Sequence, residues 1–327
     1  MRGPWKALIP LGLMVLACFS TVAEAQAWPT KPIHLIIPWP VGGYADSLGR
    51  LVAQRLSENL GQPIVVDNKG GSNGLIGAGA AAMAVPDGYT LMFHSVTSHV
   101  INPALYAQVP YGPKDLLPIT IIAATPLLLV ANNAFPAANT ADALKLAREN
   151  KDKPFAVASF GAGSGSHLAL ELLKQQAHVE LLHVPYRGGG PALMDTVAGN
   201  VPLYFAAFGL AQPLVAQGKL RALAVTGKER VSTLPDVPTL AESAGLPNFS
   251  MTVTYALWAP AHVPAPIVKR ISDEMNRIVV TSEFQERLKI EGAVGPVTTT
   301  PEQAIAFTDQ ETRRLTDLVK TAGIKLD

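Results

Sequence analysis

Hydrophobic positions along this chain follow two periods, and the two periods alternate. The short apolar run that begins at Ile33 and stops at Pro38 predicts a strand, whereas residues 48–60 carry apolar side chains at helical spacing and predict a helix. That helix ends at Gly61, and residues 64–67 predict the next strand. Strand, helix and strand form a βαβ unit, which is typical of an α/β protein.

The same alternation continues along the rest of the chain. Further helices are predicted at residues 74–85, 140–150, 167–176, 191–198, 265–280, 282–291 and 301–321. Further strands are predicted at residues 89–95, 119–131, 155–159, 180–184, 203–208, 220–226 and 252–259. The fold class is therefore predicted to be α/β, with many short loops.

The length of the chain and one long apolar stretch predict two domains. A chain of 327 residues favours two domains over one, and residues 119–131 are long enough to run from one domain into the other. We predict a discontinuous domain I of residues 26–124 and 253–327, and a domain II of residues 125–252. The crossing strands, near residues 121–128 and 252–259, are expected to act as a hinge.

The N-terminal segment predicts export. Two basic residues precede an apolar stretch at residues 7–19, and Ala23-Glu24-Ala25 has the small-x-small pattern of a signal-peptidase site. Residues 1–25 are therefore predicted to be a signal peptide that is cleaved after Ala25, so the mature protein is predicted to be exported. A retained membrane anchor is the alternative, although the stretch is short for a transmembrane helix.

Charge and cysteine content exclude several classes of protein. Removing Arg2, Lys6 and Glu24 from the 26 basic and 25 acidic residues leaves 24 of each, so no basic surface for nucleic acid is expected. Cys18 is the only cysteine, and its loss on cleavage excludes disulfides, thiol catalysis and cysteine metal sites. The residues before Cys18 leave lipidation open as an alternative.

A first glycine-rich turn follows the strand that begins at Ile33. In Pro38-Trp39-Pro40-Val41-Gly42-Gly43, the two glycines allow positive φ angles and a close approach to the main chain. A helix that begins near Tyr44 would offer unpaired N–H groups and a positive dipole end. The turn is therefore a candidate site for a small anion, and an ordinary strand-to-helix turn is the alternative.

A second glycine-rich turn, from Ser159 to His167, also lies between a predicted strand and a helix. Ser164, Ser166 and the local N–H groups are placed to bind a carboxylate or phosphate. Ser166 stands where a dinucleotide fingerprint needs glycine, and the Gly-Lys pair of a P-loop is absent. Ala162 and Ser166 replace the flanking glycines of a hydrolase nucleophile elbow. His167 is more simply a structural residue than a general base.

The order and spacing of several short motifs carry a family resemblance. The motifs are Trp28-Pro29-Thr30-Lys31-Pro32-Ile33; Pro38 to Gly43 with Asp46 and Arg50; Val66-Asp67-Asn68-Lys69 with Gly71; Pro86 to Leu91; Asn102 to Leu105; Ser159 to His167; His183 to Gly188 with Asp195; Arg221 to Thr226; Leu234 to Thr239 with Glu242; and Ala259-Pro260. With these motifs, the chain resembles the substrate-binding proteins of tripartite tricarboxylate transporters, also called Bug-type periplasmic receptors, over nearly its whole mature length.

The resemblance implies a two-lobed periplasmic binding protein of the Venus flytrap kind, type II-like, with a ligand cleft between the lobes. Such a protein closes on a small carboxylate (a dicarboxylate, an amino acid or an aromatic acid) and delivers it to the permease subunits in the membrane. It is implied to be a monomer without metal or organic cofactor, and not an enzyme.

The resemblance also implies site residues. They are Trp39, Val41, Gly42, Gly43 and Asp46 in the first turn, Gly163, Ser164 and His167 in the second, and His94, Ser95, Ala206, Ala207 and Phe208 at the ends of strands. Asp46 is expected to brace the turn, because a carboxylate repels an anionic ligand. The Ser164 hydroxyl is expected to donate to the ligand. The sequence departs from the family pattern at three places, namely Ser164, His94, and the pair Thr254 and Ala256.

The sequence alone leaves two other functions open. A loaded receptor that docks on a sensor protein needs the same cleft. An exported hydrolase needs a nucleophile and a base, and Ser, His and Asp occur here at no spacing that matches a known triad, although triads need not be close in sequence.

Overall fold

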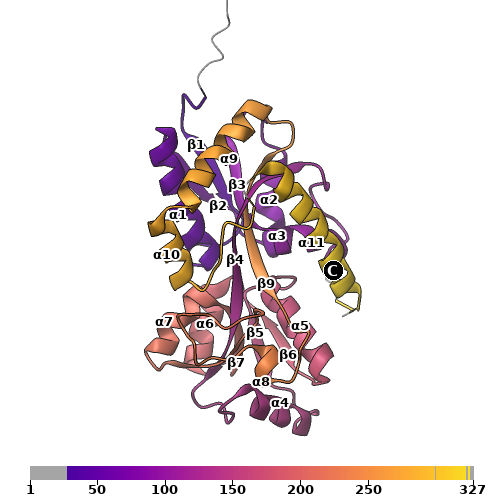
Figure 1. Ribbon diagram of the computed structural model, residues 1–327. Coiled ribbons are helices and arrows are strands. Elements are labelled where there is room, and N and C mark those ends of the chain that lie inside the picture. Colours follow the sequence, from indigo (N-terminus) through magenta and orange to yellow (C-terminus); the bar gives the residue numbers. More distant parts are fainter. Residues whose placement is uncertain (1–27, 299, 322, 325–327) are drawn as a thin grey trace, which may run out of the picture.

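The computed structural model describes residues 28–298, 300–321 and 323–324, and it consists of two lobes joined by two long strands (Figure 1). Lobe I is the upper half of Figure 1 and lobe II the lower half. The predicted signal peptide, its cleavage after Ala25 and the lipidation alternative at Cys18 lie outside the described residues. Within the described part of the chain, no helix has both the length and the apolar character needed to cross a membrane.

Lobe I is built on a sheet in the order β2, β1, β3, β9, β4. The predicted βαβ unit is present, because β1 (Ile33–Ile37) pairs in parallel with β2 (Ile64–Asn68) and α1 (Tyr44–Leu60) connects them. β1 also pairs in parallel with β3 (Thr90–Ser95), whereas β9 (Thr252–Pro260) runs antiparallel to β3. The other helices of this lobe are the 3-10 turn η1 (Ser72–Gly74), α2 (Leu75–Ala82), α3 (Val96–Leu105), α9 (Ala265–Val279), α10 (Ser282–Ile290) and α11 (Pro301–Thr321).

Lobe II has its own smaller sheet. β4 (Leu116–Asn132) pairs antiparallel with β7 (Leu203–Ala207) and β8 (Leu220–Val225), and β5 (Ala156–Ser159) pairs in parallel with β6 (Leu182–Pro185) and β7. The helices of this lobe are α4 (Thr140–Glu149), α5 (Gly165–Ala177), α6 (Gly189–Ala198), α7 (Phe208–Ala216) and α8 (Leu240–Ser243).

β4 takes part in both lobes. Its first part pairs with β9, and residues 127–132 pair with β7 and β8. Where the partners change, Thr226 Oγ1 accepts from the Leu127 N–H at 2.8 Å and donates to the Met251 carbonyl at 2.6 Å. One side chain therefore ties the two crossing segments together. The predicted domain boundaries fall at this crossing, and both the division into domains and the hinge stay predictions.

The two lobes touch each other across the space between them. The Asn73 side chain of lobe I donates from Nδ2 to the Gly163 carbonyl of lobe II at 2.7 Å. The rings of Trp39 and Phe160, also from opposite lobes, meet edge to face with centroids 6.0 Å apart. The lobes are thus in a closed arrangement.

Most predicted elements are present within a few residues, but three helices were not predicted: α3, α7 and the four-residue α8. α3 and α7 begin directly after β3 and β7, and each contains a proline, which disfavours a helix interior. Burial of Val96, Ile101 and Leu105 explains why α3 forms in spite of Pro103. Assigning Phe208 to a strand was wrong, because it is the first residue of α7.

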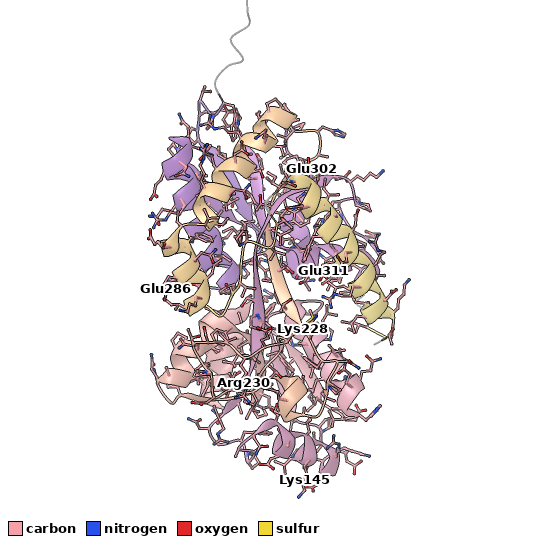
Figure 2. The ribbon with its side chains drawn as sticks, in the orientation of Figure 1. Lys145, Lys228, Arg230, Glu286, Glu302 and Glu311 are labelled. Carbon is pink, nitrogen blue, oxygen red and sulfur yellow. The ribbon has the colours of Figure 1, made fainter. Side chains whose placement is uncertain are left out.

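Charged side chains lie on the outside of both lobes. Lys145 on α4 and Glu302 on α11 are exposed and point away from the sheets (Figure 2). The sheets themselves are lined by buried apolar residues such as Leu35, Phe93 and Phe205.

Candidate ligand-binding cleft

A small cavity that opens to solvent lies between the two lobes; about 40 Å³ of it can be occupied by the centre of a water molecule. It is lined from lobe I by the turn between β1 and α1, from lobe II by Phe160 after β5 and by the segments around the starts of α6 and α7, and by one residue of β9. The lining residues are Trp39, Pro40, Val41, Gly43, Tyr44, Ala45, Phe160, Arg187, Gly188, Gly189, Gly190, Pro191, Ala207, Leu210 and Tyr255.

The first glycine-rich turn is held by a buried carboxylate. Asp46 Oδ2 accepts from the Gly42 N–H at 3.0 Å, and Asp46 Oδ1 accepts from Arg50 Nε and from Asn68 Nδ2, both at 2.9 Å. Burial opposes ionisation of Asp46, but the hydrogen bonds from Arg50, Gly42 and Asn68 outweigh it and lower its pKa. Asp46 therefore braces the turn as an anion.

The two glycines of this turn differ in conformation. Gly42 has φ 82°, in the left-handed region that favours glycine, as predicted. Gly43 has φ −88° and ψ 168°, an extended conformation open to any residue, so the positive φ that a glycine allows is not used there. Gly43 is the N-cap residue of α1 and carries no side chain that covers the helix end.

Three helix N-termini meet at the cavity. Gly43 precedes α1, Gly188 precedes α6 and Ala207 precedes α7, and none of these three N-cap residues provides a side-chain cap. Free N–H groups and the positive ends of helix dipoles favour an anion. Arg187 lies on the same cavity, is exposed, and has no hydrogen-bond or ion-pair partner among the described residues. The cavity is therefore electropositive.

The second glycine-rich turn satisfies its own polar groups. Ser164 Oγ donates to the Gly161 carbonyl at 2.6 Å and accepts from the His167 N–H at 3.4 Å, which caps α5. The Gly163 N–H donates to His167 Nδ1 at 3.1 Å. The single Ser164 proton is thus used inside the turn, and Gly163, Ser164 and His167 do not line the cavity. Their contact with a ligand stays a prediction.

A serine and a histidine meet behind this second turn. Ser159 Oγ and His183 Nε2 are 2.7 Å apart, and the His183 ring stacks on that of His167 with centroids 3.8 Å apart. Burial, and then the neighbouring His167, lower the pKa of His183 to about 3, so it is neutral. Ser159 is fully buried, which denies a substrate access to its hydroxyl.

His94 supports the wall of the cavity from behind. Trp39 Nε1 donates to His94 Nδ1 at 3.2 Å, and His94 is fully buried. Burial, and then the nearby His99, lower the pKa of His94, so the ring is neutral and carries its proton on Nε2. This hydrogen bond fixes the Trp39 ring, which packs against Phe160.

The other predicted site residues are buried around the cavity. Ser95 caps α3, because its hydroxyl accepts from the Ser98 N–H at 3.2 Å. Ala206 lies in β7 and Phe208 begins α7, both fully buried. Of the thirteen predicted residues, Trp39, Val41, Gly43 and Ala207 line the cavity.

The main residues missed by the sequence analysis belong to a third glycine-rich turn, Arg187 to Gly190. It follows β6 and opens α6, and three glycines followed by Pro191 carry the same signal as Gly42-Gly43 before α1. Phe160, Leu210 and Tyr255 had no local signal, because each reaches the cavity only through the packing of the lobes.

A buried carboxylate lies next to the cavity, at the contact between lobes. Glu291 follows α10, is only 6% exposed, and packs against Gly209 of α7. Its Oε1 accepts from Arg287 Nε at 2.7 Å, whereas Oε2 is buried and has no hydrogen-bond partner. Burial raises the pKa of Glu291, and Arg287 and Tyr44 offset this only in part.

We expect Glu291→Gln to raise the melting temperature by a few degrees at pH 7.5 and to have little effect at pH 4. A carboxyl whose pKa is raised in the folded state contributes its stability below its unfolded pKa and loses it as pH rises through the folded pKa. Calorimetry at both pH values tests this. Glu286→Gln, at an exposed carboxylate of the same helix, should change neither value, and a lower melting temperature of Glu291→Gln at pH 7.5 would contradict the argument.

Among the described residues, no group of three or more His, Cys, Asp or Glu side chains is placed to hold a metal ion. The chemistry of the cavity is therefore that of N–H donors, one guanidinium and aromatic rings. N–H donors and a guanidinium are suited to holding an anion, and the described lining residues include no nucleophile paired with a base.

The chain matches a family model and is similar in sequence to known proteins. A family model described as "Tripartite tricarboxylate transporter family receptor" matches residues 48–324. The chain is 37% identical over 288 residues to the "UPF0065 protein in tcbD-tcbE intergenic region" of Pseudomonas sp. (strain P51), which covers 88% of this chain and 85% of that relative.

Two solved structures have the same two-lobed fold. One is "R. palustris Rpa4515 with adipate", with 34% identity, a TM-score of 0.86, and coverage of 91% of this chain and 100% of that chain. The other is "MatC (Rpa3494) from Rhodopseudomonas palustris with bound malate", with 31% identity, a TM-score of 0.82, and coverage of 89% and 99%. The predicted two-lobed α/β binding-protein fold is confirmed.

Proposed function

Because this chain belongs to the tripartite tricarboxylate transporter receptor family, we propose that it captures a small carboxylate in the periplasm and delivers it to the membrane subunits of such a transporter. The family predicted from the motifs is thus confirmed, and it is a family of receptors rather than enzymes. Two similar proteins have been solved with the carboxylates adipate and malate, which supports a carboxylate here.

The observation that carries this proposal is the convergence of three uncapped helix N-termini on one cavity. Each offers N–H donors and a positive dipole end, and Arg187 adds a full charge at the cavity. No acidic residue is among the described residues that line it. A carboxylate held between the lobes would contact both, and would therefore favour the closed arrangement over an open one.

We expect a small carboxylate to stabilise the protein. Ligand at about one hundred times its dissociation constant adds roughly 2.7 kcal/mol to the free energy of unfolding. The measurement is a thermal-shift screen of adipate, malate, citrate, amino acids and benzoate, followed by calorimetric titration of each hit. The protein should first be unfolded and refolded, so that any ligand carried through purification is removed.

The control is an uncharged analogue of each hit, for example 1,6-hexanediol for adipate. It should bind at least about tenfold more weakly, because a hydrogen bond to a charged group contributes about 1.5–3 kcal/mol. The proposal fails if none of the carboxylates stabilises the refolded, ligand-free protein.

A further inference from the structure

We propose that the preferred ligand of the cavity is an aromatic monocarboxylate, with its ring held between aromatic walls and its carboxylate at the helix N-termini. This inference rests on the proposed function and narrows it. It commits to one of the three carboxylate classes that the family resemblance leaves open.

Four aromatic rings line the cavity. Trp39 and Phe160 meet edge to face, with an interplanar angle of 83° and centroids 6.0 Å apart. Tyr44 and Tyr255 form a second pair, tilted by 59° with centroids 5.4 Å apart. Rings attract one another most in such tilted or offset arrangements. Each of the four rings is at most 9% exposed in the closed arrangement, so a ligand ring would enter between them while the lobes are apart.

The rings are fixed in place by their neighbours. His94 accepts from the Trp39 indole at 3.2 Å, and the Tyr255 ring stacks on Phe93 at 4° with centroids 5.7 Å apart. A wall that is already ordered loses little conformational entropy when a ligand binds. The aromatic surface is therefore preorganised.

The polar groups of the cavity suit a single carboxylate. Among the described residues that line it, Arg187 is the one charged side chain, and no Asp, Glu, Asn, Gln, Ser or Thr is present. The N–H donors of the three helix ends and Arg187 provide for one anionic end of a ligand. The remaining lining is provided by the rings, Val41, Leu210, prolines, alanines and glycines.

These lining residues disfavour the other two ligand classes, amino acids and dicarboxylates. The ammonium group of an amino acid would find no carboxylate among the described lining residues. For the second carboxylate of a short diacid, the described lining residues offer no second cation, and beyond the helix ends only the Tyr44 and Tyr255 hydroxyls are side-chain donors. A buried charge that is only partly paired is unfavourable. An aryl carboxylate places its apolar part against those walls and its charge at the helix ends.

Four probes test the proposal by calorimetric titration: benzoate, cyclohexanecarboxylate, benzamide and adipate. Benzoate should bind at least about threefold more tightly than cyclohexanecarboxylate, because a pair of aromatic rings contributes about two- to tenfold beyond its buried area. Benzoate should also bind more tightly than benzamide, which lacks the charge, and than adipate.

A variant at Phe160 tests whether the preference for benzoate depends on the aromatic wall of the cavity. In Phe160→Leu, the preference for benzoate over cyclohexanecarboxylate should fall to within about twofold. The ratio of the two affinities is the readout, because any effect on lobe closure changes both affinities alike. Phe155→Leu is the matched control, since Phe155 packs against Phe135 in the same lobe and does not line the cavity. It should keep the wild-type ratio.

The outcomes separate this inference from the proposed function. Binding of adipate or malate with equal or weaker binding of benzoate would overturn the aromatic preference and leave a carboxylate receptor. Equal affinity for benzoate and cyclohexanecarboxylate would also overturn it, since it would show an apolar and not an aromatic selectivity. Failure of every carboxylate would overturn the proposed function itself.

Discussion

Gly43→Val is expected to lower ligand affinity by at least about a hundredfold while the protein stays folded. The backbone at Gly43 is extended, and a Cβ there would meet only the Pro40 carbonyl, at 3.7 Å, which is an ordinary contact. The loss of a glycine N-cap costs about 1 kcal/mol. The fold therefore tolerates the valine.

The cavity does not tolerate it. Gly43 lines the cavity at the N-terminus of α1, so a β-branched side chain covers the approach to the first N–H groups of that helix. Each hydrogen bond to a carboxylate contributes about 1.5–3 kcal/mol, or roughly ten- to a hundredfold in affinity, and two or more would be lost. Calorimetric titration with the best ligand of the screen, with melting temperatures for both proteins, measures the effect.

Gly42→Ala is the matched control for this turn. Gly42 has φ 82°, so a side chain there is strained by roughly 1–2 kcal/mol, yet a Cβ would meet nothing within 4 Å and the residue does not line the cavity. Gly42→Ala should therefore lose stability and keep more affinity than Gly43→Val. Affinity of Gly43→Val within threefold of the wild type would remove this turn from the site.

Gly42 and Gly43 illustrate which features of the turn the sequence predicts and which depend on the rest of the fold. A glycine pair between a strand and a helix predicts a turn that exposes N–H groups, and such a turn is present. Which glycine takes the positive φ depends on Asp46, whose carboxylate is shared by Gly42, Arg50 and Asn68. Asn68 lies on β2, so this network could not be predicted from the turn itself.

The second and third glycine-rich turns also differ in a way that their composition does not predict. The turn from Ser159 to His167 has the composition of an anion site, but its Ser164 and His167 side chains bind back to its own main chain. The turn from Arg187 to Gly190 has no such side chains and leaves its helix end free. Composition predicts where N–H groups lie, and only the three-dimensional packing decides whether they are already used.

Asn73 is expected to control the closed arrangement of the lobes. Its side-chain amide donates to the Gly163 carbonyl of lobe II at 2.7 Å and to Asn102 Oδ1 of lobe I at 2.8 Å, and the residue is 7% exposed. Asn102 in turn donates to the Asn73 carbonyl and to the Tyr111 hydroxyl, each at 3.2 Å. Removal of the amide leaves two buried acceptors without a partner, at a cost of about 1–3 kcal/mol each.

Asn73→Gly should therefore destabilise the protein by about 2–5 kcal/mol, weaken ligand binding about five- to a hundredfold, and expand the unliganded protein. Glycine is chosen because Asn73 has φ 51°, which glycine adopts without strain. Only the Gly163 bond crosses between the lobes, so its loss disfavours the closed form, and the apparent affinity falls with the population of that form. Small-angle scattering without and with saturating ligand should show an expanded protein that becomes compact on loading.

His178→Gly is the control for the substitution itself. His178 has the same φ of 51°, is exposed, and makes no contact between the lobes, so its replacement should leave stability, affinity and scattering close to those of the wild type. If Asn73→Gly lowers the melting temperature but keeps wild-type affinity and scattering, the amide stabilises the interior of lobe I alone. The closed arrangement would then depend on the ring contact of Trp39 with Phe160 and on the packing of Glu291 against Gly209, neither of which involves Asn73.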